Sequence, residues 1–150
     1  MKLRRWQNHI AADLATVLDR IESGIPTHLE FIRPLVRAGL VEQSMLPGSL
    51  LLLCARAIGS KTDLLPTLHA FAAAMELITL SIHTHSRLPD QPAQLPTVPL
   101  LSLGSAAGVL FGDLLYTHAF SMIVGCRHRE AIAEMATATE HMAYCSRTPT

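Results

Sequence analysis

The chain has 150 residues, enough for one domain with a core that needs no disulfide or metal. Its 12 basic residues balance its 12 acidic residues and it has no basic run or RNA-binding signature, which excludes a typical nucleic-acid-binding protein. Apolar residues make up 49% of the sequence and charged residues only 16%, so we expect more apolar surface than a lone small domain hides, and therefore contact with another chain or a membrane.

The first predicted element is an amphipathic helix that ends in the Ser-Gly-Ile-Pro segment at 23–26. Its apolar residues follow the helical period: Trp6, Ile10, Leu14, Val17 and Ile21. A second helix is expected to start at Thr27, which has capping-box spacing to Glu30, with a kink or restart at Pro34. Its inward-facing residues are predicted to be Leu29, Ile32, Leu35, Val36 and Leu40.

Pro47-Gly48 predicts the next break, and residues 50–58 then form a helix that is apolar on almost every side and ends at Gly59. Such a helix is typical of the middle of a bundle, so we expect Cys54 to be a core residue. A long helix should follow from Pro66, in its first turn, to about His85.

Four prolines predict a loop over residues 86–103, the only obvious linker. Small residues in the next segment predict a helix over 105–124 that approaches its neighbours closely: Ala106, Ala107, Gly108 and Gly112. A last helix over 129–143 should bury an apolar face that Thr139 interrupts: Ile132, Met135, Ala136, Met142 and Ala143.

No strand alternation or internal repeat occurs, so the sequence predicts an all-α protein, an antiparallel helical bundle. Residues 1–150 form a single domain in this interpretation. It has an N-terminal helix (1–26), core helices (27–85), the Pro-rich loop (86–103) and C-terminal helices (104–150).

The segment 98–125 is apolar enough to require comparison with a membrane span. Its uncharged part, 98–112, is shorter than the roughly 20 residues that a spanning helix needs. Asp113 and His118 follow, and a charge at the centre of a span costs about 2.5–3.5 kcal/mol. We therefore expect a buried helix of a soluble protein, with at most peripheral membrane contact.

Three stretches, in order, resemble the trans-polyprenyl diphosphate synthase family. Residues 50–59 are similar to its helix ending in Ala-Arg-Ala-Leu-Gly, and residues 72–78 to its Ala-Ala-Ala-Val-Glu-Leu-Ile. Residues 104–120 resemble its Gly-Asn-Ala-Ala-Val-Leu-Ala-Gly-Asp-Tyr-Leu helix. The resemblance covers roughly residues 30–145 and implies the N-terminal half of the isoprenoid synthase fold.

The residues that carry the family's chemistry are missing. Its His-Asp-Asp-x-x-Asp motif, which holds Mg²⁺ against an allylic diphosphate, corresponds to a vestigial His85-Ser86-Arg87-Leu88-Pro89-Asp90. The basic Gly-Lys-Arg-x-Arg-Pro stretch corresponds to residues 43–48, which have no basic residue. The arginine pair after the aspartates is also lost, and the chain ends before a second aspartate-rich motif.

The resemblance therefore implies a non-catalytic small subunit, regulatory or stabilising, of a heteromeric polyprenyl diphosphate synthase in isoprenoid biosynthesis. The expected partner is a full-length prenyl diphosphate synthase chain, or a second copy in a homodimer. No cofactor is expected, and Mg²⁺ would enter only through a catalytic partner. The family's dimer interface implies contact residues on the helix 105–124: Leu110, Asp113, Leu114 and Thr117.

Residues about one turn before the aspartate motif line the prenyl-chain tunnel in the family. They correspond to Ile78, Ser81, Ile82 and His85, for which ordinary core packing is the alternative. The other open interpretations are a stand-alone helical module that binds an isoprenoid or lipid, a residual prenyltransferase, and a truncated pseudo-synthase without a role.

We predict no metal site and no catalytic residue. His83 and His85 point about 200° apart on a helix and cannot share a metal, and Cys126 with His128 lacks further ligands. Asp113 and Glu76 lie in apolar helices, so each should have a hydrogen-bond partner.

The three cysteines, Cys54, Cys126 and Cys145, are widely spaced without a CxxC pair, which suits reduced thiols. The basic N-terminus leads into an amphipathic stretch and is not a signal peptide. We expect a cytoplasmic protein.

Overall fold

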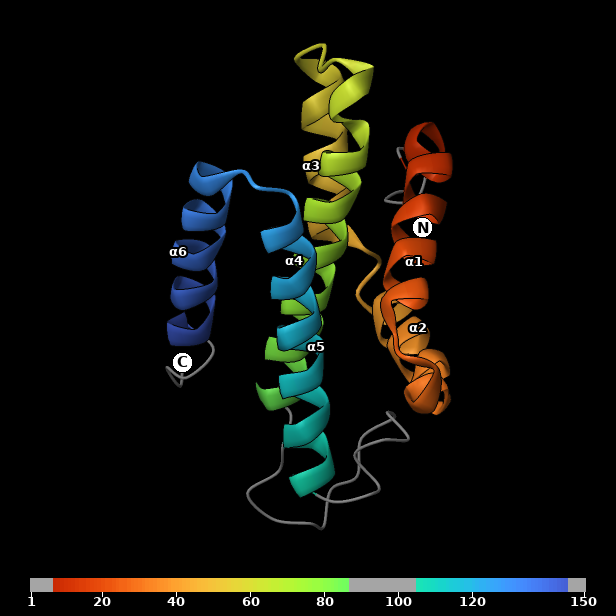
Figure 1. The fold of residues 1–150 in the computed structure, drawn as a ribbon, viewed down its shortest axis with the longest axis vertical. Helices are drawn as coiled ribbons and strands as arrows, with labels where there is room; N and C mark the ends of the chain where they lie inside the picture. The colour runs from red at the N-terminus through yellow and green to blue at the C-terminus, as the bar shows by residue number, and fades with distance from the viewer. Residues whose placement is uncertain (1–6, 87–104, 146–150) are drawn as a thin grey trace.

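The computed structural model describes residues 7–86 and 105–145, and within these ranges it contains helices and turns but no strand. It confirms the predicted all-α antiparallel bundle (Figure 1). The α-helices are α1 (Ala11–Gly24), α2 (Arg33–Glu42), α3 (Leu46–Ala57), α4 (Leu65–Ser86), α5 (Ser105–Gly125) and α6 (Arg129–Cys145). Short 3-10 helices precede three of them: η1 (Gln7–Ile10), η2 (Thr27–Ile32) and η3 (Thr62–Leu64).

Helix α4 is the centre of the bundle and packs against α1, α2, α3, α5 and α6. Its alanines at 72–74 are fully buried, and side chains of this size let neighbours approach from several directions. The predicted central helix over 50–58 is not central. Cys54 is exposed and Ile58 is 83% exposed, because α3 packs through one face only, which carries Leu52 and Ala55.

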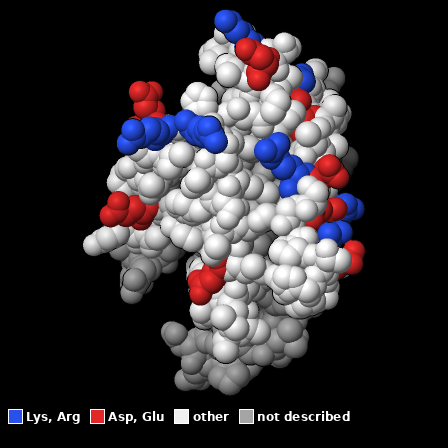
Figure 2. Space-filling view, in the orientation of Figure 1, with Lys and Arg blue, Asp and Glu red and all other residues white. Residues whose placement is uncertain are grey.

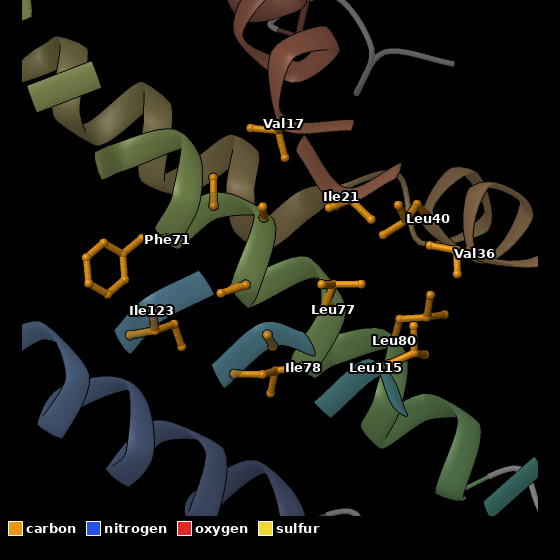
Figure 3. Packing of buried hydrophobic residues seen from close by; sticks show 14 of the residues in the cluster. Val17, Ile21, Val36, Leu40, Phe71, Leu77, Ile78, Leu80, Leu115 and Ile123 are labelled. Atoms are coloured by element: carbon orange, nitrogen blue, oxygen red, sulfur yellow. The ribbon is translucent and has the colours of Figure 1, made fainter. Parts of the chain in front are cut away.

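The core forms where α1, α2 and α5 meet α4 (Figure 3). Helix α1 contributes Val17 and Ile21, and α2 contributes Val36 and Leu40, all of them fully buried as the periodicity predicted. Buried Leu77 and Leu80 of α4 lie opposite them in Figure 3, and Leu115 and Ile123 of α5 close the other side. These contacts fix α4 as the scaffold for any site on its remaining face.

The starts of the helices test the predictions made from capping residues and prolines. Helical structure begins at Thr27 as predicted, in the 3-10 helix η2, but no capping box forms there, because Thr27 makes no capping hydrogen bond and Glu30 pairs with Arg33 at 3.3 Å. The predicted restart at Pro34 is confirmed, because the 3-10 geometry of η2 changes to α in that turn.

The chain break before α3 lies earlier than predicted. Ser44 and Met45 have left-handed φ angles of 60° and 47°, whereas Pro47 lies in the first turn of α3. Proline fits there because its missing N–H would have no partner inside the helix. The predicted glycine stop is confirmed, since Gly59 has φ of 70° directly after α3.

Helix α5 lies antiparallel to α4 and closely packed against it (Figure 1). The Ser81 hydroxyl donates a 2.8 Å hydrogen bond to the Gly112 carbonyl, and a Cβ at Gly112 would lie 2.4 Å from Nε2 of His85. The glycine therefore permits the contact that the small-residue pattern predicted.

The expectation that α5 is buried holds for one face only. Leu110 and Val124 on its outer face are 69% and 63% exposed. In the described ranges two helices, Thr62–Ser86 and Ala106–Gly125, are long and apolar enough to cross a membrane. A third candidate arises if the bent pair Thr27–Glu42 and Leu46–Ala57 is counted as one span.

Helix α6 contacts the bundle lightly, through α4. Ile132 and Met135 of its predicted apolar face are half-buried, but Ala136, Met142 and Ala143 are exposed, so that part of the prediction is wrong. Thr139, predicted as the interruption, is instead the buried residue of the helix. Its hydroxyl donates to the Met135 carbonyl at 2.7 Å, which removes the cost of burying it.

Candidate functional site: an apolar cavity between α4 and α6

A cavity with a volume of about 710 Å³ lies between α3, α4 and α6. Its walls are dominated by apolar side chains: Leu51 of α3, Leu68, Phe71, Met75 and Ile78 of α4, and Met135 of α6. Figure 3 shows Phe71 projecting from α4 on the side where α6 lies. Ligand pockets commonly have about 300–1,000 Å³, so this cavity has the size of a ligand site.

Helical spacing brings the two main walls face to face. On α4 the lining residues recur every three or four positions, as Leu68, Phe71, Met75 and Ile78 do. On α6 the lining residues include Ala131 and Ala138, whose short side chains leave open the space that larger residues would fill. The cavity lies where α6 contacts the bundle only lightly, and Ala131 and Ala138 leave part of the space between the larger lining residues open.

Two of the three threonine hydroxyls in the lining, those of Thr79 and Thr139, are satisfied by their own helix, and the third belongs to Thr67. Thr79 donates to the Met75 carbonyl at 2.8 Å, and Thr139 donates to the Met135 carbonyl. Glu134 and His128 are the ionisable residues of the lining, and both are exposed. A ligand in this cavity would meet mainly apolar surface and few groups that require a polar partner.

Glu76 of α4 is the most deeply buried ionisable residue in the described part of the chain, with no exposed surface, and it is not part of the cavity lining. Its Oε1 accepts a 2.7 Å hydrogen bond from the backbone N–H of Gly48, in the first turn of α3, as the expectation of a partner required. Its Oε2 has no hydrogen-bond partner among the described atoms. Burial raises the pKa of Glu76 to about 7, and the hydrogen bond from Gly48 opposes part of that rise.

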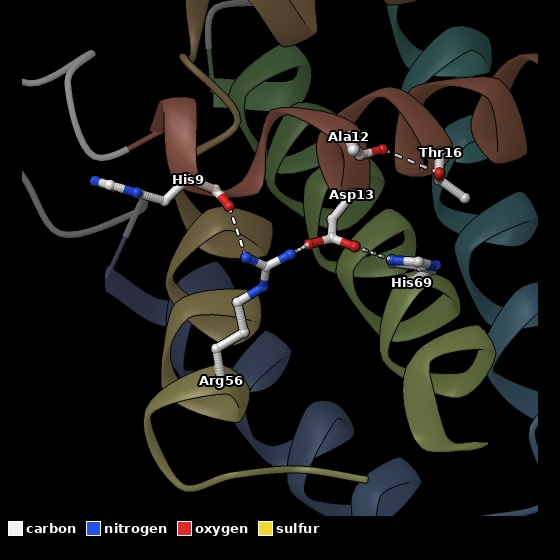
Figure 4. Close-up of polar contacts among 6 residues, drawn as sticks. All are labelled: His9, Ala12, Asp13, Thr16, Arg56 and His69. Atoms are coloured by element: carbon white, nitrogen blue, oxygen red, sulfur yellow. Dashed lines mark hydrogen bonds and ion pairs between the residues drawn. The ribbon is translucent and has the colours of Figure 1, made fainter. Parts of the chain in front are cut away.

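Asp13 forms the main polar junction between helices that pack on α4 (Figure 4). Its carboxylate accepts hydrogen bonds from Nη2 of Arg56 at 2.7 Å and pairs with Nε2 of His69 at 3.0 Å. Arg56 also donates to the His9 carbonyl at 2.7 Å. Since these residues come from α1, α3, α4 and η1, the group ties the helices together, and none of its residues lines the cavity.

The four residues predicted for a prenyl-chain pocket do not gather in one place. Ile78 lines the cavity, whereas Ser81 is buried against α5 through its bond to Gly112. Ile82 is half-buried against the core, and His85 lies 3.4 Å from Asp113 of α5. A tunnel through all four stays a prediction.

The vestigial motif lies mostly outside the described residues, since Arg87 and Asp90 are not among them. Ser86 ends α4 and donates to the His83 carbonyl at 3.0 Å. His83 is exposed and His85 half-buried. In the described part of the chain no group of three or more His, Cys, Asp or Glu residues is placed to hold a metal ion.

The residues predicted for a partner interface lie along α5. Leu110, Asp113 and Thr117 are exposed and Leu114 is half-buried. Asp113 has a partner on the adjacent helix, His85, as expected, although its side chain is 64% exposed. These positions are accessible to another molecule, but the identity of a partner stays a prediction.

Comparisons with family models, with curated proteins and with solved structures found no match. The resemblance to polyprenyl diphosphate synthases therefore stays a prediction from residues 50–59, 72–78 and 104–120.

The sequence missed one feature of the site and predicted another only in general terms. The cavity itself was missed because Phe71, Met75 and Met135 have the spacing of ordinary core residues. Glu76 was expected to find a partner, but its contact with the start of α3 depends on how two helices cross. The signal that was available is the small Ala131 and Ala138 facing large residues.

Proposed function

We propose that this protein is a non-catalytic helical protein that binds an apolar chain, of isoprenoid or other lipid type, in the cavity between α4 and α6. The observation that carries the proposal is the apolar wall of this cavity, in which the hydroxyls of Thr79 and Thr139 are already bonded to their own helices. Such a surface favours a ligand without polar groups along its length, because an unpaired polar group loses its water there.

Chain length should decide the affinity of such a ligand. Each buried methylene contributes about 0.8 kcal/mol, which is roughly a four-fold change in the dissociation constant. We therefore expect the affinity of linear and prenyl alcohols to rise with length until the cavity is filled, and then to level off. Calorimetric titration or displacement of a fluorescent fatty-acid probe would measure the series.

Small residues of the α6 wall provide a matched pair of variants. Ala131→Leu and Ala138→Leu would each fill part of the cavity. The affinity of the ligand series should then stop rising at a shorter chain length. Ala133→Leu, on an exposed position of α6 outside the lining, makes the same chemical change and should leave binding unaltered. Equal affinity for every chain length, or an equal loss in all three variants, would contradict the proposal.

The absence of catalysis is proposed on sequence grounds. Residues 85–90 carry one aspartate beside an arginine, in place of the acidic cluster that holds two diphosphates with Mg²⁺ in the synthases that the chain resembles. Magnesium-dependent elongation of an allylic diphosphate by the purified chain alone would overturn this part of the proposal.

A second candidate is the small subunit of a heteromeric polyprenyl diphosphate synthase. Leu110, predicted for the interface, is 69% exposed, which favours burial against another chain. Co-expression with a full-length synthase should give a complex with altered activity or product length. Leu110→Ser should weaken that complex, whereas Val41→Ser, which changes a 61% exposed residue of α2, should not. A synthase that neither co-purifies nor changes its products would exclude this candidate.

A further inference from the structure

The C-terminal half of α5 exposes aromatic and apolar side chains next to one another. Tyr116 and Val124 are 40% and 63% exposed, and Phe120 between them is half-buried. The rings of Tyr116 and Phe120 contact each other, with centroids 4.8 Å apart. The whole helix is as apolar as a membrane span, yet only 33% of its apolar window is buried in the bundle.

Two of the hydroxyls on this face have little need of water. The Thr117 hydroxyl donates to the Asp113 carbonyl at 2.8 Å, and the Ser121 hydroxyl donates to the Thr117 carbonyl at 3.0 Å. Moving this face out of water therefore leaves the Thr117 and Ser121 hydroxyls paired, whereas the Tyr116 hydroxyl needs a polar partner among the lipid headgroups. These two hydroxyls add little cost when the face leaves water, and Asp113, one turn before Tyr116 and 64% exposed, is the acidic side chain that has to stay in water.

Basic residues border the same surface. Arg127 and Arg129 follow α5 directly and are exposed, and Arg20 of α1 lies close enough to Cys126 for its charge to act on that thiol. Glu130 is the acidic residue beside them in the chain. Figure 2 shows Lys and Arg side chains along one edge of a broad area without charges, on the face that α5 occupies in Figure 1.

We propose that Tyr116, Phe120, Val124, Arg127 and Arg129 form a surface that binds the headgroup region of a bilayer containing anionic lipids. Tyrosine and phenylalanine with an aliphatic neighbour suit the boundary between headgroups and acyl chains, and guanidinium groups pair with lipid phosphates. Together they supply both contributions that hold a protein on an anionic membrane, which are buried apolar area and electrostatic attraction.

The charges on the other helices favour lying on the membrane over spanning it. Helix α1 packs on α4 and carries exposed Asp19 and Arg20, and Arg37 of α2 is exposed as well. A spanning bundle would bring these charges into hydrocarbon, at a cost of a few kcal/mol each. The surface on α5 can contact lipid headgroups while these charged side chains stay in water.

Membrane binding by this surface does not require a ligand in the cavity, so the two proposals can fail separately. Flotation with phosphatidylcholine vesicles, with and without phosphatidylserine, tests it directly. The protein should float with the mixed vesicles, and less so in high salt or without phosphatidylserine. Arg127→Gln with Arg129→Gln should weaken binding about 30-fold, from roughly 1 kcal/mol for each basic residue.

Exposed residues elsewhere provide the control. Tyr116→Ser with Val124→Ser should abolish flotation, whereas Phe31→Ser with Ile58→Ser, which removes two apolar residues that are 67% and 83% exposed, should leave it unchanged. A failure to float with either vesicle, or an equal loss in both double variants, would overturn the proposal. If the parent protein does not float but forms a dimer, and the double variant Tyr116→Ser with Val124→Ser is a monomer, the surface binds a second copy of the chain instead of a membrane.

A fluorescence measurement reports insertion without weakening the surface. In a Trp6→Phe background, Val124→Trp should shift its emission to the blue on mixed vesicles and be quenched by brominated lipid. Ile58→Trp in the same background, on the exposed face of α3, should show neither change. The reverse pattern would place α3 against the membrane and refute the assignment to α5.

Discussion

Replacing Glu76 by glutamine should make the bundle more stable at alkaline pH. The carboxylate is completely buried, and it has one hydrogen bond, from Gly48. Glutamine keeps an oxygen that can accept the Gly48 N–H, but it has no charge to desolvate. The variant therefore separates the cost of the buried charge from the benefit of the hydrogen bond.

The expected magnitude follows from the pKa of Glu76, which burial raises from the ordinary 4.5 to about 7. Each unit of difference between the folded and the unfolded pKa is worth about 1.36 kcal/mol. At a pH above both values, ionisation of Glu76 therefore lowers the free energy of unfolding by about 3 kcal/mol. Because the folded pKa lies above the unfolded one, the stability is fully present below about pH 4.5 and is lost as the pH rises to about 7.

Urea unfolding followed by circular dichroism across this pH range measures the effect. The difference between Glu76→Gln and the parent protein should be smallest at pH 4.5 and reach about 3 kcal/mol above pH 7. Glu140→Gln makes the same change at an exposed position of α6 and should give a flat difference. The reasoning is refuted if the difference in unfolding free energy between the parent protein and Glu76→Gln does not change with pH.

Four further substitutions, one of them a control, test the packing around α4. Gly48→Ala should cost about 1–3 kcal/mol in urea unfolding, because its Cβ would lie 3.0 Å from Oε1 of Glu76 and 3.2 Å from the Ala72 carbonyl oxygen. Gly112→Ala should cost less than Gly48→Ala, because its Cβ would meet the end of the His85 ring, which is 37% exposed and can turn away, while Gly125→Ala, which meets nothing within 4 Å, should be neutral or slightly stabilising. Asp13→Ala should cost about 1–3 kcal/mol by leaving His69, whose side chain is 12% exposed, without its carboxylate. A neutral result for Asp13→Ala would mean that its hydrogen bonds contribute nothing net to stability.

Helix ends marked by residues with restricted or unusual backbone angles were predictable. Gly59 adopts the left-handed angle expected after α3, and Pro66 lies in the first turn of α4. Thr27 failed as a cap because capping also requires the following residues to enter an α-helix at once, and here they form a 3-10 turn. A local side-chain preference cannot decide that geometry.

The central helix could not be identified from apolar content. Residues 50–58 and the middle of α4 are both apolar on most sides, but buried Ala72 and Ala74 let neighbours pack around α4, whereas Leu50 of α3 stays 52% exposed. Side-chain size, more than hydrophobicity, determines how many helices can surround one. The cavity could not be predicted for a related reason. Met135 has the helical spacing of a core residue whether or not the side chain opposite it fills the space between the helices.

The central position of α4 has a consequence for biosynthesis. Helices α1, α2 and α3 are translated before the segment on which they pack, so their apolar faces stay in water until Ser86 has left the ribosome. At about 5–20 residues per second, that interval is on the order of a few seconds for the roughly 30 residues after α3. During it, the nascent chain presents a target for chaperones that hold unfolded segments.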